Sequence, residues 1–307
     1  MTDDLRHQID RFVVRRQRLT ERHPWLFPVA VRVHRFRRRL LWMRRREPLA
    51  RQRGAPEFVR ISRHNSLLRR ELEPEEMGLQ DGKVVNLRLA SARLDGVVIR
   101  PGEYFSFNRL VGNCTRRKGY VEGMRLSNGD ARAGIGGGIC QLANLVHWMA
   151  LHSPLTITER SEHSFDPFPD NGRVLPWGSG CSIVYNYVDL CFRNDTELSF
   201  SLHVAVGDRY LEGELRASEV PAHSYRVSAR DEEFLSLGTE YFRRNELWRT
   251  AIDRRTGDVV GEELIRRNCA LVKYVPLDST VRDLTAEWSG LDPRDPRAEL
   301  GSAERLR

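Results

Sequence analysis

A glycine-rich loop that runs straight into a helix-like segment places one cysteine where a thiol could act as a nucleophile. Four glycines fall within residues 134–138, and Cys140 follows two residues later. Glycine lets the backbone turn tightly and approach its neighbours closely. In the first turn of a helix, unpaired N–H groups and the helix dipole favour negative charge, which lowers the pKa of a thiol. The sequence therefore predicts that Cys140 is a reactive thiolate.

A nucleophilic cysteine needs a base within hydrogen-bond reach. His147 lies seven residues further on, about 10 Å along a helix axis, so we expect it only to pack or hydrogen-bond at the surface. His163 closes the strand expected after the helix, and we predict that it is the base. Papain-like and transglutaminase-like enzymes add a group that orients this histidine. The sequence leaves four candidates for that group, namely Asp166, Asp170, Asn186 and Asp189.

The same loop could also stabilise an oxyanion, or it could be purely structural. Donors for an oxyanion would be the Gln141 side chain and the N–H groups of Gly136, Gly137 and Gly138. In the structural alternative, Cys140 is a small buried side chain and the glycines only allow close helix–sheet packing. The cysteines and histidines lack the short spacing of a zinc site, and the loop lacks the Lys-Ser/Thr of a phosphate-binding loop. We therefore predict no metal and no cofactor.

Composition separates a basic N-terminal part from the remainder of the 307-residue chain. Residues 1–60 contain 17 Arg against 6 Asp and Glu, which gives them a net charge of +11 and leaves −3 for the rest. The five cysteines are irregularly spaced, unlike a disulfide framework. The N-terminus does not resemble a signal peptide, and no apolar run approaches the ~20 residues of a membrane span. These features predict a cytoplasmic protein.

Residues 1–57 are predicted to form an Arg-rich amphipathic arm. Within residues 24–46, arginines are interleaved with apolar side chains. One interpretation is a solvated helix that packs Phe36, Leu40 and Met43 on the body of the protein. The other is a helix that lies on an anionic membrane surface, at the inner face of the membrane. No aromatic-basic motif accompanies the arm, so we predict no nucleic-acid partner.

The elements that must position Cys140 indicate a mixed α+β fold. We predict an antiparallel sheet packed on one central helix that carries the glycine loop and the cysteine at its N-terminus, and a papain-like or transglutaminase-like architecture is one form of this fold. Apolar residues at helical spacing from Ile139 to Ala150 should face the sheet, and Pro154 should end the helix. Further helices are predicted at 66–77 and 86–95. Strands are predicted at 97–99, 104–108, 119–126, 155–158, 182–192 and 199–206, with a β-rich region at 209–275.

These elements divide the chain into a core at residues 58–206, a β-rich C-terminal extension at 207–275 and a charged, flexible tail at 276–307. Aromatic and amide side chains of the core could line a substrate cleft. We predict that this cleft is formed by Tyr104, Phe107, Asn108, Trp177 and Tyr185.

Several motifs, in this order, resemble those of the VanW family. They are Arg100–Asn108, Val111-Gly112, Gly119-Tyr120, the loop Gly134–Gln141, and Glu159-Arg160 with His163-Ser164. The resemblance covers roughly residues 95–200 and implies a link, through gene neighbourhood, to glycopeptide resistance and cell-wall precursors, without a settled activity. The chain departs from the family pattern at Ala143 and Asn144, where many members have small hydroxyl residues. It also departs at residues 178–183, where many members have an Asp.

Two functions follow from the residues and the resemblance. The first is thiol-dependent acyl or amide chemistry on a peptide-like or cell-wall-precursor-like substrate, with Cys140 as nucleophile and His163 as base. The second is a non-catalytic module that binds a peptide or glycan in the predicted cleft and docks at the inner membrane surface.

Overall fold

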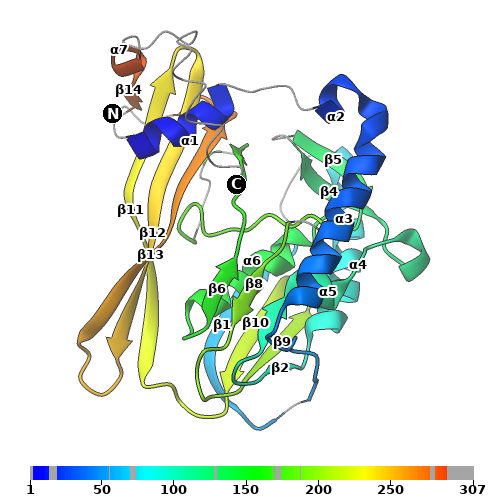
Figure 1. Cartoon of the computed structure of the whole chain (residues 1–307), viewed down its shortest axis with the longest axis vertical. Coiled ribbons are helices and arrows are strands. Elements are labelled where there is room, and N and C mark those ends of the chain that lie inside the picture. Colours follow the sequence, from blue (N-terminus) through cyan, green and yellow to red (C-terminus); the bar gives the residue numbers. More distant parts are fainter. Residues whose placement is uncertain are drawn as a thin grey trace.

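A computed structural model of the chain describes residues 3–13, 19–54, 56–69, 74–127, 130–167, 169, 174–186, 188–276 and 281–288. These residues contain both helices and mainly antiparallel sheets, which confirms the predicted mixed α+β class. Figure 1 shows two larger sheets beside each other, with the first helix against one sheet and a long N-terminal helix along the other part of the molecule.

The central sheet has four antiparallel strands in the order β1-β10-β9-β2. These strands are β1 (Val59–Leu67), β10 (Tyr210–Ala217), β9 (Phe200–Val206) and β2 (Val97–Ile99). Two helices, α4 (Pro74–Leu94) and α6 (Cys140–Leu151), pack on this sheet and share its hydrophobic cluster. The sheet therefore carries two helices where the sequence predicted one.

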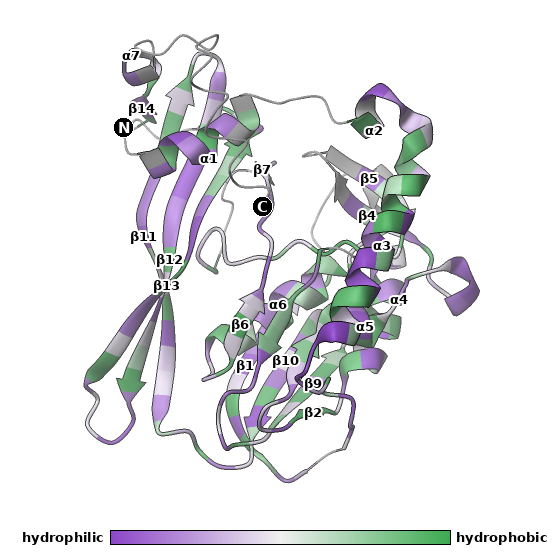
Figure 2. Ribbon diagram, in the orientation of Figure 1, coloured by the Kyte–Doolittle hydropathy of each residue, from purple (hydrophilic) through white to green (hydrophobic). Residues whose placement is uncertain are grey.

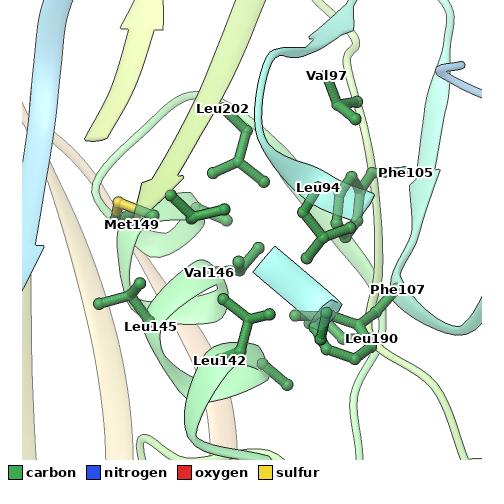
Figure 3. Packing of buried hydrophobic residues seen from close by; sticks show 14 of the residues in the cluster. Leu94, Val97, Phe105, Phe107, Leu142, Leu145, Val146, Met149, Leu190 and Leu202 are labelled. Carbon is green, nitrogen blue, oxygen red and sulfur yellow. The ribbon is translucent and has the colours of Figure 1, made fainter. Parts of the chain in front are cut away.

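Helix α6 buries the face that its helical spacing predicts. The residues of that face are buried, namely Ile139, Leu142, Ala143, Leu145, Val146, Met149 and Ala150. Gly213 of β10 gives α6 room to approach, because a Cβ there would lie 2.7 Å from the Cε atom of Met149. Figure 3 shows the apolar side chains of α6 meeting Leu94 of α4 and Leu202 of β9. This packing fixes the position of Cys140 at the N-terminal end of α6.

A three-stranded sheet and a hairpin complete this part of the molecule. The sheet has the order β3-β8-β6, with β3 (Tyr104–Ser106), β8 (Cys191–Arg193) and β6 (Thr156–Glu159). The hairpin of β4 (Glu122–Ser127) and β5 (Asp130–Ile135) contacts α4 through β4. Short helices α5 (Phe107–Val111) and η2 (Arg116–Lys118) connect β3 to the hairpin. Residues 128–129, between these two strands, lie outside the described residues.

Two predicted elements are wrong. Instead of the long strand predicted at 182–192, the described residues show a turn at residues 185–186, a bridge between Val184 and Val188, and then the short strand β8. The carboxylate of Asp189 accepts hydrogen bonds from the N–H groups of Asn108 and Leu190. These bonds to a side chain, and not a ladder to a neighbouring strand, hold the backbone of this segment. The helix predicted at 66–77 is also wrong, since residues 66–67 belong to β1 and α4 begins only at residue 74.

The strand predicted at 104–108 ends early, at Ser106. The Ser106 side chain accepts a hydrogen bond from the N–H of Arg109 at 3.2 Å and caps α5. A serine hydroxyl that satisfies a free N–H group favours the start of a helix at this point. Strand β3 therefore gives way to a helix after three residues.

The C-terminal part forms a second sheet, in the order β14-β11-β12-β13-β7. Its strands are β14 (Val281–Asp283), β11 (His223–Leu237), β12 (Glu240–Asp253), β13 (Val259–Val272) and β7 (Phe165–Asp166). The predicted β-rich region is confirmed, and a turn at residues 254–256 follows β12. Strand β14 and helix α7 (Thr285–Trp288) lie in the segment that the sequence predicted as a tail, and the residues after 288 lie outside the described part.

The N-terminal arm is divided between the two parts. Helix α1 (Asp3–Val13) packs Leu5 and Ile9 on the C-terminal sheet, beside Phe242. After α2 (Leu19–Arg22) and η1 (Pro24–Leu26), helix α3 (Phe27–Arg44) runs along the side of α5 and the small sheet (Figure 1). Within the described residues, no helix combines the length and the apolar character that crossing a bilayer requires.

Candidate functional site

The glycine loop before α6 is shaped by close contact with α4 and β4. Gly136 and Gly138 have φ angles of +74° and +93°, which favour glycine. A Cβ at Gly137 would lie 2.1 Å from the carbonyl oxygen of Gly123. The carbonyl of Gly137 accepts a hydrogen bond from Asn86 Nδ2 of α4 at 3.0 Å. Steric fit therefore accounts for three of the four glycines without a ligand.

Cys140 is the first residue of α6, and it is half-buried. Burial raises the pKa of the Cys140 thiol. The nearby backbone of Ile183 and the charge of Arg125 offset this increase only in part. The expected lowering of the thiol pKa by the helix start is therefore wrong, because desolvation of the thiolate outweighs the nearby donors.

We expect iodoacetamide to alkylate Cys140 at pH 7 at least about threefold more slowly than it alkylates free cysteine, because only the thiolate reacts. The rate constant can be measured by mass spectrometry of the peptide that contains Cys140, with Cys140→Ser confirming the assignment. A rate above that of free cysteine would contradict this expectation and indicate an activated thiol.

His163, the predicted base, binds another partner. Its Nδ1 atom lies 3.1 Å from the hydroxyl of Ser182, and burial followed by the charge of Arg160 lowers the pKa of its imidazole. Cys140 meets the next residue, Ile183, so the structure brings both predicted catalytic side chains to the same short segment. Within the described part of the chain, no hydrogen bond joins Cys140 directly to His163.

The predicted supporting side chains are bound elsewhere. The side-chain amide of Gln141 donates to the hydroxyl of Ser66 at 2.8 Å and to the carbonyl of Leu67 at 2.7 Å, so its N–H groups are already used. Asp166 is buried in β7 and its carboxylate accepts from Arg243 at 3.3 Å and from the Tyr274 hydroxyl at 3.1 Å. The structure thus places Gln141 at the end of β1 and Asp166 in the C-terminal sheet. Asp170 lies outside the described residues.

Sequence reasoning missed a polar network behind α6 that is centred on Arg160. The guanidinium donates to the carbonyls of Gly178 and Gly180 and to Asn268 Oδ1 at 3.3 Å. Arg160 thereby ties the motif segment both to residues 178–180 and to β13. The glycines at residues 178 and 180 leave their carbonyl groups accessible to a guanidinium. The sequence, however, contains no pattern that predicts Arg160 as the donor.

His147 belongs to the same region and is fully buried, contrary to the expected surface position. Its Nδ1 atom lies 2.8 Å from the carbonyl oxygen of Ser179, and its Nε2 atom has no hydrogen-bond partner among the described residues. Burial, with a smaller contribution from the charge of Arg160, lowers the pKa of His147 to about 3. His147 is therefore neutral at pH 7.

Two Arg-rich hollows lie beside α3. The first, which we call the α3–β6 hollow, has a volume of about 530 Å³ and is lined by Arg38, Leu41, Trp42, Arg44, Arg45, Arg46, Glu47, Thr158, Glu159, Cys191 and Arg193. The second, the α3–α5 hollow, has a volume of about 390 Å³ and is lined by Trp42, Leu49, Arg51, Arg53, Asn108, Arg109, Leu110, Gly112 and Tyr185. Among the residues that the structure describes, the lining of the α3–α5 hollow has three arginines and no acidic side chain.

The five predicted cleft residues do not meet at one place. Asn108 and Tyr185 line the α3–α5 hollow. Phe107 is buried in the central hydrophobic cluster, and Tyr104 is buried beneath the guanidinium of Arg45. Trp177 lies near the C-terminal sheet, where its carbonyl accepts a hydrogen bond from Asn245 of β12. Only two of the five can therefore contact a common ligand.

The described side chains contain no group of three or more His, Cys, Asp and Glu residues that is close enough to hold a metal ion. Guanidinium groups are the main charged groups at the hollows, and they bind carboxylate or phosphate oxygens through paired N–H donors.

Comparison with known proteins identifies the family. The family described as "VanW like protein" matches residues 82–216. The "Vancomycin B-type resistance protein VanW" of Enterococcus faecalis is 32% identical over 206 residues, which are 67% of this chain and 74% of that protein. The chain belongs to the VanW family. The "Uncharacterized protein YoaR" of Bacillus subtilis is 35% identical over 96 residues, 30% of this chain and 32% of that protein. No solved structure matches the chain.

The two departures from the VanW pattern contact each other in the fold. Asn144, which stands where many members have a small hydroxyl residue, accepts a hydrogen bond on Oδ1 from the N–H of Cys181 at 2.7 Å. Cys181 lies in the stretch that lacks the expected Asp, and its side chain is buried. The contact joins α6 to this stretch, so the departures form one structural unit next to Cys140.

Proposed function

We propose that this VanW-family protein binds, without transforming it, a peptide- or glycan-containing cell-wall precursor that carries an anionic group. The observation that carries this proposal is the lining of the α3–α5 hollow. It combines two aromatic side chains, Trp42 and Tyr185, with three arginines. Aromatic faces suit sugar and peptide groups, whereas guanidinium groups suit carboxylate and phosphate.

The three arginines of this hollow differ in how they are held. Arg53 donates to the carbonyls of Ala92 and Arg93 at the end of α4, and the guanidinium of Arg109 lies 4.9 Å from the centre of the Trp42 ring. Arg51 is exposed and lies near Tyr104. The fold thus holds the guanidinium groups of Arg53 and Arg109 in place. The exposed guanidinium of Arg51 is the one that we expect to bind the anionic group of a ligand.

The name of the E. faecalis relative connects that protein with vancomycin resistance. We extend this connection to the present chain as part of the proposal, since a drug that acts on cell-wall precursors would be opposed by a protein that binds the same precursors. The proposal requires no covalent chemistry at Cys140.

Replacing Arg51 by Gln should weaken binding of a muramoyl pentapeptide 1-diphosphate about tenfold, because a charge-assisted contact to the anion is lost. Titration calorimetry on the full chain measures this affinity, and the muramoyl pentapeptide without the diphosphate shows how much of the effect depends on the anion. Arg255→Gln, in the exposed turn between β12 and β13, is the matched control and should bind as the wild type does. Unchanged affinity of the Arg51 variant for both probes would refute the proposal.

Thiol-dependent acyl or amide chemistry is the second candidate, with Cys140 as nucleophile and His163 as base. It is favoured by the position of Cys140 at the start of α6, with the backbone of Ile183 beside its thiol. A Cys140→Ser variant separates the two functions. The binding function predicts that it keeps full probe affinity and full biological effect, whereas the thiol function predicts that the biological effect is lost.

A further inference from the structure

Helix α3 has two faces of different character. One face holds the helix on the body of the protein. Arg38 forms a paired salt bridge with Glu159 of β6, at 2.6 and 2.5 Å, and this contact raises the pKa of Arg38. Arg35 lies over the ring of Tyr185 at 5.3 Å, and its carbonyl accepts a hydrogen bond from Asn186. The body-facing side of α3 is therefore polar and aromatic.

The opposite face carries an unbroken apolar stripe. Its members recur at intervals of four and three residues, and they are Val29, Val33, Phe36, Leu40 and Met43. With about 100° between successive residues, all five lie within about 80° of arc, roughly opposite the side that holds Arg35 and Arg38. Phe36 is 59% exposed and Met43 is 70% exposed. The expected packing of Phe36 and Met43 on the body is therefore wrong. Leu40 is half-buried, and the other four side chains of the stripe are exposed.

Arginines flank this stripe on both sides. Arg32 and Arg39 lie along one edge and Arg37 and Arg44 along the other, and all four are exposed. The sequence contains no acidic residue between Arg22 and Arg46. At the start of α3, Phe27 is also exposed, at 58%, and so is Trp25 just before the helix, at 71%. Figure 2 shows the resulting mixture of apolar and polar residues along the whole helix.

We infer that α3 docks this protein on an anionic lipid bilayer, with the stripe Val29–Met43 in the interface and the flanking arginines on lipid phosphates. A helix with an apolar stripe between rows of arginine lies in the plane of the membrane surface, where apolar burial and attraction to anionic lipid act together. A second copy of the chain does not fit this face, because pairing two such helices would bring arginine rows against arginine rows. The inference is independent of the ligand proposed for the α3–α5 hollow.

The direct test is co-sedimentation of the full chain with vesicles. Phosphatidylcholine vesicles with about one third phosphatidylglycerol should bind the protein in about 0.1 M salt, whereas pure phosphatidylcholine should bind it weakly. The double variant Phe36→Ser/Met43→Ser should lower the bound-to-free ratio at least about tenfold. Its thermal melt should match that of the wild type, because both side chains point away from the body.

Two further variants make the test specific. Val259→Ser/Val260→Ser removes two exposed apolar side chains from β13, at 61% and 52% exposure, and should leave vesicle binding unchanged. Arg32→Gln/Arg39→Gln should weaken binding to the anionic vesicles by about fivefold per arginine. Equal binding of the stripe variant and the wild type would overturn the inference. A second outcome would also overturn it. In that outcome the wild type does not bind vesicles but forms a dimer in sedimentation equilibrium, and the stripe variant stays monomeric.

Discussion

Replacing Gly137 by alanine should lower the free energy of unfolding by about 3 kcal/mol, because the new methyl group meets backbone that cannot swing aside. The Cβ would lie 2.1 Å from the carbonyl oxygen of Gly123 and 2.9 Å from its Cα. For a domain of this size, such a loss corresponds to a melting temperature about 6–12 °C lower. Urea unfolding followed by circular dichroism measures the effect directly.

Helix α4 supplies a matched pair of variants for this experiment. A Cβ at Gly82 would lie 1.9 Å from the carbonyl oxygen of Glu122 in β4, so Gly82→Ala should destabilise the protein as Gly137→Ala does. Gly78 lies on the same helix with no heavy atom within 4 Å of its Cβ position. Gly78→Ala should therefore be neutral or stabilising by up to about 1 kcal/mol. If Gly137→Ala were also neutral, the loop would not be held by this contact and a functional reason for its glycines would be needed.

The same contacts explain what the sequence could predict about the glycine loop. Its glycines and the helical spacing after Cys140 are local features, and both the tight backbone and the buried face of α6 follow from them. The partner of the loop is Asn86, about 50 residues earlier, which also bonds both the N–H and the carbonyl of Val121. No local sequence pattern indicates that Asn86 bonds to the loop. The structural role of the glycines could therefore be recognised only once the fold was known.

The neighbourhood of Cys140 shows a similar division. The sequence places Cys140 at a helix start and His163 on a later segment, and the structure brings both to residues 182–183. The pKa of the thiol depends on how many atoms surround it, which is set by packing from distant segments. Helix-end electrostatics act over one turn and can be read from sequence, whereas desolvation cannot. This is why the predicted direction of the Cys140 pKa shift was wrong.

The long strand predicted at 182–192 failed for a related reason. Alternating apolar and polar residues favour a strand, and the pattern alone gives no sign of a break. The break occurs where Asp189, a buried carboxylate, takes a hydrogen bond from the Ser106 hydroxyl at 2.6 Å and from the N–H of Asn108 at 2.8 Å. A buried carboxylate needs such donors, and their positions more than 80 residues earlier decide the local backbone.

The buried imidazole of His147 leads to the other large expected effect, on the pH dependence of stability. The pKa of His147 is about 3 in the folded protein and about 6.5 in the unfolded chain. As the pH falls through about 6.5, the unfolded chain binds a proton that the folded protein does not, so stability declines from about pH 6.5 down to about pH 3. Between pH 7.5 and 5.0, His147 alone should lower the free energy of unfolding of the wild type by about 2 kcal/mol.

A His147→Gln variant should show a correspondingly smaller loss of stability over the same interval. Glutamine can still donate to the carbonyl of Ser179 but binds no proton in this range. The other histidines whose pKa is lowered by burial, His64, His152 and His163, remain in both proteins, so the difference between the two curves isolates His147. Urea unfolding at pH 7.5 and 5.0 gives the four free energies needed. Identical pH dependence of variant and wild type would mean that the folded protein accepts a proton on His147, and hence that Nε2 has an acceptor or solvent within reach behind α6.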